Sequence, residues 1–275
     1  MLKIKNSIPN FITSLNIAAG TLSIIFSFEG LPKEAAYFIL AAAVFDFLDG
    51  MSARLLNARS EMGKELDSLA DIVSFGIAPA IIVYHIMKSS LLIDVLYPHN
   101  LETYRMLYLF SFVLIPIFSA LRLAKFNIDD RQTSSFIGLP TPANALFFAA
   151  IPIVASQNPF EPILFLFYDK NYLLSIIIAS SLLLVSPIPM FSFKFKNLKL
   201  KENALRFSFL FLSLLLLIGA GWEKGNLLWS IISSGRLHFI FPEIFYIIAK
   251  GLPVIIFLYI LLSIINSLYL KLKKR

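Results

Sequence analysis

The chain has 275 residues, of which 58% are hydrophobic and only 15% are charged. Soluble domains usually carry about 25% charged residues, so this composition and a mean hydropathy of +0.79 exclude an ordinary soluble domain and indicate a polytopic membrane protein. The net charge is +7, but the basic residues flank apolar segments, which predicts topology signals and contacts with anionic membrane lipids and no binding of nucleic acid.

Eight apolar segments are long enough, alone or supported by neighbours, to cross the hydrocarbon as helices. They cover residues 11–28, 34–56, 65–87, 104–126, 142–155, 172–189, 204–220 and 244–270. The fifth is short and residues 221–241 fit a hairpin or a re-entrant piece, so six or seven spans are alternatives. The expected fold is an all-α polytopic membrane protein with about eight transmembrane helices.

The distribution of basic residues predicts the orientation of these spans. Most of the 24 Lys and Arg residues lie at the two termini or in the segments that follow even-numbered spans. The positive-inside rule then places both termini on the cytoplasmic side of the cytoplasmic (inner) membrane. It places the junction of the second and third spans on that side as well.

Four aspartates lie at this junction, in apolar surroundings. They are Asp46 and Asp49 near the end of the second span and Asp67 and Asp71 near the start of the third. An ionisable residue at membrane depth costs at least about 2.5 kcal/mol on insertion scales, so such residues indicate a functional site.

Helical spacing places the four aspartates on two faces that can meet. At 100° per residue, one arc of the second span carries Asp46, Asp49, Gly50 and Ala53, bordered by Arg54. One stripe of three- and four-residue steps on the third span carries Gly63, Asp67, Asp71, Ser74 and Ala78. Helices joined by a short loop are antiparallel neighbours, so the pattern predicts a polar cleft that is lined by four carboxylates.

Four converging carboxylates would repel one another, and a bound cation is the obvious remedy. The chain has no cysteine, which excludes thiolate ligands, and only three histidines. An all-oxygen site suits Mg²⁺, Mn²⁺ or Ca²⁺. Two such ions could use three carboxylates chiefly as ligands and leave the fourth for proton transfer, as in metal-assisted phosphoryl transfer. On spacing alone, a cation or proton transport path explains the acids equally well.

The spacing of these residues also resembles a family signature. The sequence reads Asp46-x2-Asp49-Gly50-x2-Ala53-Arg54-x8-Gly63-x3-Asp67-x3-Asp71. This resembles the full signature of the CDP-alcohol phosphatidyltransferase family. The resemblance implies a helical bundle with a six-helix core plus C-terminal additions, usually a homodimer, in which an alcohol displaces CMP from a CDP-linked lipid.

The resemblance also implies roles for the signature residues. Asp46, Asp49 and Asp67 resemble the metal ligands, and Asp71 would contribute to metal binding and serve as general base. The implied cofactor is a divalent metal, Mg²⁺ or Mn²⁺, as two ions, with Ca²⁺ as an alternative. The residues expected to contact the CDP-lipid are the small residues Gly50, Ala53 and Gly63, together with Arg54 at a phosphate.

Further stretches resemble the phosphatidylserine synthase branch of this family. They are IPNFITSLN at 8–16, SFGIAPA at 74–80, RLAKFN at 122–127 and FIGLPTPA at 136–143. The implied substrates are CDP-diacylglycerol and L-serine, with glycerol 3-phosphate or inositol as alternative acceptors. The resemblance divides the chain into a catalytic core at 1–195 and a C-terminal transmembrane extension at 196–275. Residues 136–143 would either cover the cleft or form a rigid connection.

Individual residues in these stretches have two possible roles each. Asn10 and Thr13 could bond the cytosine or ribose of the CDP-lipid or cap a helix. Arg122 could hold the serine carboxylate bidentately or act as a topology anchor, and Asn127 is a further candidate for serine binding. Ser74 could contact serine or only permit close helix packing.

Overall fold

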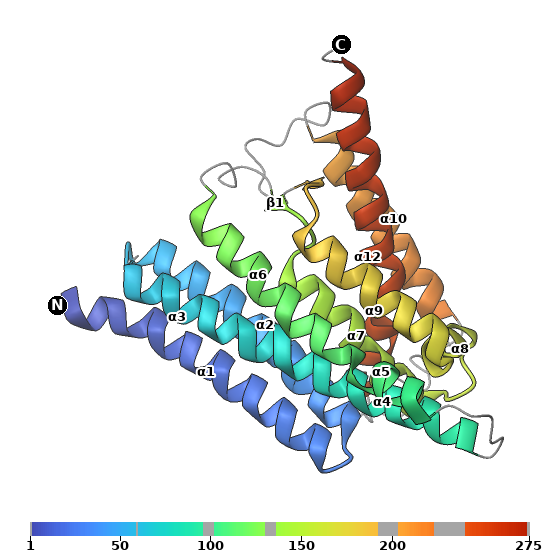
Figure 1. Ribbon diagram of the computed structural model, residues 1–275. Helices are drawn as coiled ribbons and strands as arrows, with labels where there is room; N and C mark the ends of the chain where they lie inside the picture. Colours follow the sequence, from blue (N-terminus) through green and yellow to red (C-terminus); the bar gives the residue numbers. More distant parts are fainter. Residues whose placement is uncertain are drawn as a thin grey trace.

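A computed structural model describes residues 2–58, 60–95, 102–129, 136–191, 203–222 and 240–273 (Figure 1). The first part of the chain forms α1 (Leu2–Phe28), α2 (Pro32–Leu55), α3 (Glu61–Asp71), the π-helical turn η1 (Ile72–Ile77) and α4 (Ala78–Val95). The middle forms α5 (Glu102–Phe110), the 3-10 turn η2 (Ser111–Val113), α6 (Leu114–Ile128), strand β1 (Phe136–Ile137) and α7 (Thr141–Gln157). The last part forms η4 (Pro162–Leu164), α8 (Phe165–Tyr168), α9 (Lys170–Val185), strand β2 (Pro189–Met190), α10 (Ala204–Trp222) and α12 (Ile240–Lys273).

The helices have the length and composition of an integral membrane protein. Within the described ranges, six helical segments are long and apolar enough to cross a membrane, and η4–α8 together with α9 form a further candidate span that is bent by 84°. The fifth predicted segment corresponds to α7, which has only 17 residues. The predicted all-α polytopic membrane fold is confirmed. The segment 221–241, predicted as a hairpin or re-entrant piece, lies almost entirely outside the described residues.

Helix α7 lies inside the bundle, where α2, α4 and α12 pack against it. Its side chains are buried along most of its length, including Ala145, Phe148, Ala149 and Ile153. A helix surrounded by other helices does not need to match the bilayer thickness by itself. This explains how a short apolar segment forms a central element of the fold.

Local sequence signals define several helix starts. The Ser60 side chain accepts a hydrogen bond from the Gly63 backbone N–H at 3.0 Å and thereby caps α3. The Asp169 carboxylate caps α9 in the same way through the backbone N–H groups of Asn171 and Tyr172. Pro32 occupies the first turn of α2, where its missing N–H removes no helical hydrogen bond.

A two-residue antiparallel ladder between β1 and β2 interrupts the helical pattern. Phe136 pairs with Met190 and Ile137 pairs with Pro189. Gly138 follows with a φ of +79°, which favours glycine, and its N–H donates to the Ile188 carbonyl at 2.9 Å. The sequence prediction contained no strand. These contacts favour the rigid connection over the cover as the role of residues 136–143.

The ends of the elements gather on two sides of the bundle. In Figure 1, the N-terminus, the junction of α2 with α3, the end of α6 and β1 lie toward the upper left, and the junction of α1 with α2 and the start of α5 lie toward the lower right. Lys3 and Lys5 near the N-terminus, Arg54 and Lys64 beside the α2–α3 junction, and Arg122 and Lys125 in the last turns of α6 belong to the segments at the upper left.

Candidate functional site

The facing ends of α2 and α3 bring three aspartates together. One carboxylate oxygen from each of Asp46, Asp49 and Asp67 lies within 4.8 Å of the other two, a grouping that could hold a metal ion. Asp46 and Asp49 lie one helical turn apart on α2, and the short connection capped by Ser60 turns α3 back against them. The convergence that helical spacing predicts for these three residues is observed.

Asp71 is the last residue of α3 and is also buried. Its exposed fraction is 8%, and its carboxylate interacts electrostatically with those of Asp46 and Asp67 and with the Arg122 guanidinium. One turn of helix separates Asp71 from Asp67, which carries its side chain away from the three-oxygen group. Asp71 therefore borders the aspartate cluster on the side of Arg122.

Three of the carboxylates each have one buried oxygen without a hydrogen-bond donor among the described residues. Across the described parts of the chain, no partner reaches Oδ2 of Asp49, Oδ1 of Asp67 or Oδ1 of Asp71. A buried charge without a partner is costly, and ion pairing or metal coordination is the usual compensation. Because the atoms available as metal ligands are carboxylate oxygens, the site fits a hard divalent cation such as Mg²⁺ or Mn²⁺.

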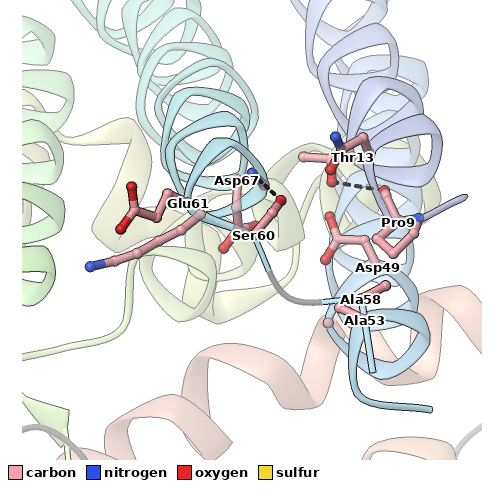
Figure 2. A pocket seen from close by; sticks show the side chains of 12 residues that line it. Pro9, Thr13, Asp49, Ala53, Ala58, Ser60, Glu61 and Asp67 are labelled. Carbon is pink, nitrogen blue, oxygen red and sulfur yellow. Dashed lines mark hydrogen bonds between the residues drawn. The ribbon is translucent and has the colours of Figure 1, made fainter. Parts of the chain in front are cut away.

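A cavity of about 500 Å³ opens beside these carboxylates. Figure 2 shows Asp49 on one side of it and Ser60 with Asp67 on the other, while Pro9 and Thr13 approach from α1. Its lining comprises Pro9, Asn10, Thr13, Asp49, Gly50, Ala53, Ala58, Ser60, Glu61, Gly63, Lys64 and Asp67. Small side chains from α2 and α3 keep this cavity open, since a Cβ on Gly63 would lie 3.2 Å from Oδ1 of Asn10.

Most of the residues predicted to contact the CDP-lipid line this cavity. They are Asn10, Thr13, Gly50, Ala53 and Gly63. Arg54 does not line it, because its side chain is exposed and its Nε donates to the Gly50 carbonyl at 2.8 Å. The Thr13 hydroxyl donates to the Pro9 carbonyl at 3.0 Å within its own helix.

Sequence reasoning missed several lining residues of this cavity. Ser60, Glu61 and Lys64 belong to the start of α3 and line it beside Gly63. Ser60 carries a detectable signal, since a serine three residues before Gly63 at a helix start is a typical N-cap. Pro9 and Ala58 carry no comparable signal, because nothing in their local sequence indicates that α1 crosses this end of α2.

A second cavity, of about 430 Å³, lies between α6, β1 and the end of α9. Its charged lining residues are Arg122, Lys125 and Asp129, and Ile137 and Leu184 contribute apolar wall. Arg122 has an exposed fraction of 6%. Its Nη1 donates to Oγ1 of Thr141 at 3.1 Å, and its guanidinium lies 5.3 Å from the ring centroid of Phe126.

The aspartates lie close to residues of both cavities. Asp49 and Asp67 line the first cavity, and Asp46 and Asp71 interact electrostatically with Arg122, which lines the second. Such an arrangement suits a reaction that joins two ligands across a carboxylate-bound metal.

The other two residues predicted to bind serine lie elsewhere. Nδ2 of Asn127 donates to Oγ of Ser68 at 2.9 Å. The backbone carbonyl of Asn127 accepts from Nζ of Lys64 at 3.1 Å, so Asn127 connects α6 to α3. Ser74 is fully buried, and its hydroxyl donates to the Asn16 carbonyl at 2.9 Å. Of the three candidates, the structure places only Arg122 on the second cavity.

The π-helical turn explains the position of Ser74. The predicted stripe assumes 100° per residue from Asp71 through Ser74 to Ala78, but η1 occupies Ile72–Ile77 with i→i+5 hydrogen bonds. The wider turn changes the helical phase after Asp71. Ser74 instead lies against α1, where a Cβ on Gly20 would come within 2.7 Å of its Cα.

The sequence also matches known proteins. Residues 6–192 match the family model for CDP-alcohol phosphatidyltransferase. A CDP-diacylglycerol–serine O-phosphatidyltransferase of Mycobacterium leprae is 37% identical over 191 residues, which cover 66% of this chain and 57% of that protein. One of Bacillus subtilis is 36% identical over 159 residues, which cover 58% of this chain and 80% of that protein.

A further relative carries a different name. An archaetidylserine synthase of Methanothermobacter thermautotrophicus is 32% identical over 185 residues, which cover 66% of this chain and 68% of that protein. The chain spans less than two thirds of the length of the mycobacterial relatives. The matched region includes both cavities and ends before α10. The chain belongs to the CDP-alcohol phosphatidyltransferase family.

Proposed function

We propose that the chain transfers the phosphatidyl group of CDP-diacylglycerol to L-serine. The serine hydroxyl would form a bond to the lipid-linked phosphorus while the bond to CMP breaks, giving phosphatidylserine and CMP. The observation that carries this proposal is the aspartate cluster close to two cavities, one lined by the small signature residues and the other by the buried Arg122. The names of the Mycobacterium leprae and Bacillus subtilis relatives support the choice of substrates.

Asp46, Asp49 and Asp67 would hold a divalent metal, Mg²⁺ or Mn²⁺, and Asp71 would contribute to a second ion; Ca²⁺ is an alternative. When bound, the metal would neutralise charge on the pyrophosphate and on the leaving CMP. The orphaned carboxylate oxygens of Asp49, Asp67 and Asp71 support this assignment.

The first cavity would receive the nucleotide end of the CDP-lipid. Gly50, Ala53 and Gly63 leave room for it, and the side chains of Asn10 and Thr13 offer polar atoms to the cytosine and ribose. Arg54 lies at the edge of the same helix face. Its guanidinium would bind a phosphate of the CDP-lipid in place of its present hydrogen bond to the Gly50 carbonyl.

The second cavity would receive serine. Arg122 would hold the serine carboxylate through a bidentate hydrogen bond, and Asp71 would take the proton from the serine hydroxyl. The electrostatic interaction between Arg122 and Asp71 supports a shared ligand, because serine carries its carboxylate and hydroxyl on adjacent carbons. Direct contacts of Asn127 and Ser74 with serine stay predictions, since their side chains bond other groups.

The charges of the second cavity favour serine over other acceptors. Arg122 and Lys125 offer positive charge and Asp129 offers negative charge within one cavity, which matches an amino acid with one carboxylate and one ammonium group. Glycerol 3-phosphate would meet an unfavourable carboxylate there, and inositol has no charge for Arg122 to bind. A cation or proton transporter, the candidate from another class, would not need a second cavity with a buried arginine.

We further propose the setting in which this reaction occurs. Residues 1–195 would form the catalytic core and residues 196–275 a C-terminal transmembrane extension, in a homodimer. The active site and both termini would face the cytoplasm from the inner membrane. The gathering of the N-terminus, the α2–α3 junction and the end of α6 on one side of the bundle supports this orientation (Figure 1).

A single assay tests the proposed function. Purified full-length chain in lipid–detergent micelles is given CDP-diacylglycerol with Mg²⁺ or Mn²⁺, and CMP release is measured with serine, inositol or glycerol 3-phosphate as acceptor. We expect CMP release with serine and its loss in the presence of EDTA. Release that depends on another acceptor would overturn serine as the substrate, and no release with any acceptor by folded protein would overturn the enzyme assignment.

A further inference from the structure

Tyr259 of α12 lies outside the region that matches the family, but it is buried beside the second cavity. The match ends at residue 192, and Tyr259 has an exposed fraction of 6%. Its hydroxyl donates to the Phe191 carbonyl at 3.0 Å. Phe191 directly follows β2, so this bond joins the C-terminal helix to the strand ladder.

The strand ladder forms part of the wall of the second cavity. Ile137 of β1 lines that cavity, and the Leu139 N–H donates to the Leu183 carbonyl at 2.9 Å. Leu184 and the three residues after it line the same cavity. A Cβ on Gly138 would overlap the Leu184 carbonyl oxygen, so the ladder and the end of α9 are in direct contact. The β1–β2 ladder and residues 184–187 at the end of α9 therefore form one packed unit.

Both C-terminal helices hold this unit through three aromatic rings. The ring of Phe191 lies 4.8 Å from that of Tyr259 and 5.6 Å from that of Phe209 on α10, centroid to centroid. The rings of Phe209 and Tyr259 lie 6.0 Å apart. Leu184 of the cavity wall belongs to the same buried apolar cluster. Packed rings in this geometry restrict the position of the residues they contact.

Tyr259 also lies close to the charged side of the cavity, because its side chain interacts electrostatically with the Arg122 guanidinium. Tyr259 therefore contacts the wall of the cavity through Phe191 and also interacts with the buried Arg122 guanidinium. A displacement of the wall relative to Arg122 would change the space available to the acceptor. Small misplacements of binding groups cause large losses in enzymes.

We propose that Tyr259 is a positioning residue for the acceptor, through which α10 and α12 fix the β1–β2 wall of the second cavity relative to Arg122. The inference rests on the proposed function, in which this cavity receives serine. It assigns to the C-terminal helices a role in the affinity for the acceptor, although no described residue of α10 or α12 is part of the lining given for either cavity.

Helix α12 supplies a matched control. Tyr246 has an exposed fraction of 3%, and its hydroxyl donates to Oε1 of Glu161 at 3.1 Å. It lies 13 residues before Tyr259, or about 20 Å along the helix at 1.5 Å per residue. Replacement of either tyrosine by phenylalanine removes one buried hydroxyl bond from the same helix. Only the bond of Tyr259 is connected to the second cavity.

The test measures CMP release by the full-length chain and compares the KM for serine with the KM for CDP-diacylglycerol. Tyr259→Phe is expected to raise the serine KM about 5- to 10-fold, corresponding to one lost hydrogen bond, and to leave the CDP-diacylglycerol KM within about twofold. Phe209→Leu, which removes a ring but no polar group, is expected to raise the serine KM in the same direction. Tyr246→Phe is expected to leave both constants within about twofold.

Two results would overturn the inference while the proposed function stands. One is a serine KM that stays within about twofold in both Tyr259→Phe and Phe209→Leu. The other is an effect that is not specific: either Tyr259→Phe raises the KM of both substrates equally, or Tyr246→Phe raises the serine KM as much as Tyr259→Phe does. Absence of serine-dependent CMP release by the unmodified chain would overturn the proposed function itself, before any variant is compared.

Discussion

The two cavities near the aspartate cluster are built in different ways. The first is formed by α1, α2 and the start of α3, which follow one another in the chain, and its two lining aspartates, Asp49 and Asp67, belong to consecutive helices. The second is formed by α6, β1 and the end of α9, and a residue of α12 supports its wall from more than 100 positions after Arg122. Segments that are close in the sequence therefore form the first cavity, whereas packing between distant segments forms the second.

Under the proposed function, the aspartates carry out the phosphatidyl transfer and the second cavity selects the acceptor. Carboxylates on two consecutive helices converge whenever those helices pack, so the aspartate cluster depends on few long-range contacts. The second cavity depends on a strand ladder that pairs residues 136–137 with 189–190.

The largest expected effect is at the cluster itself. Asp71→Asn removes the proposed base and is expected to reduce the rate of CMP release by about 10²- to 10⁴-fold, while binding of the CDP-lipid stays measurable. Turnover is measured with saturating substrates, and lipid binding is measured separately by equilibrium titration.

Asp169→Asn is a matched control for that change. Asp169 is exposed and caps α9, and asparagine caps a helix about as well as aspartate. Its activity is expected to equal that of the unmodified chain. Normal turnover in Asp71→Asn would remove the assignment of Asp71 as base.

A smaller effect is expected at the strand ladder. Gly138→Ala would place a Cβ against the Leu184 carbonyl oxygen in a residue with a φ of +79°. Backbone strain and overpacking together should lower the free energy of unfolding by at least about 2 kcal/mol. Thermal unfolding in detergent measures this change.

Gly30→Ala separates the two contributions. Gly30 has a similar φ of +74°, but a Cβ there meets no atom within 4 Å, so only the backbone strain of about 1 kcal/mol is expected. Equal destabilisation by both substitutions would contradict the close contact between the ladder and α9.

The smallest effect concerns the far end of α12, where Nζ of Lys250 lies 2.6 Å from Oε1 of Glu161. The hydrogen bond from Lys250 lowers the pKa of Glu161 below its ordinary value. A carboxylate with a lowered pKa in the folded state stabilises the fold above its ordinary pKa, and this contribution is lost as the pH falls through the folded-state value.

Glu161→Gln should therefore reduce the unfolding temperature by a few degrees at neutral pH, with a difference that disappears as the pH falls through the lowered folded-state pKa of Glu161. The serine KM should not change, because Glu161 contacts α12 at Tyr246 and Lys250, at least nine residues before Tyr259. A difference between the two chains that is independent of pH would show that the charge of Glu161 contributes nothing.

Helical periodicity was sufficient to predict how Asp46, Asp49 and Asp67 converge, because their spacing is a property of two regular helices joined by a short loop. It also predicted part of the first cavity, since Gly50, Ala53 and Gly63 lie on the same helix faces as the acids. The prediction failed at Ser74, where a π-helical turn changes the phase of the helix. No residue in that turn signals the change in the sequence.

The second cavity could be predicted only in part. Arg122 was found because it lies near the end of the fourth predicted span, at the level of the aspartates, in a stretch that resembles the phosphatidylserine synthase branch. Thr141 and Tyr259 were not found, because their roles depend on contacts with Arg122 and Phe191 that connect separate segments. Contacts of this kind are set by tertiary packing and leave no periodic pattern.

The central claim is that the two cavities receive different substrates, and one pair of variants tests it directly. The KM for serine and the KM for CDP-diacylglycerol are measured in Arg122→Ala and in Arg54→Ala. Loss of a charged hydrogen bond should raise the serine KM about 10- to 100-fold in Arg122→Ala, with the CDP-diacylglycerol KM within about twofold. Arg54→Ala should raise mainly the CDP-diacylglycerol KM. Equal increases in both constants in both variants would contradict the division of substrates between the cavities.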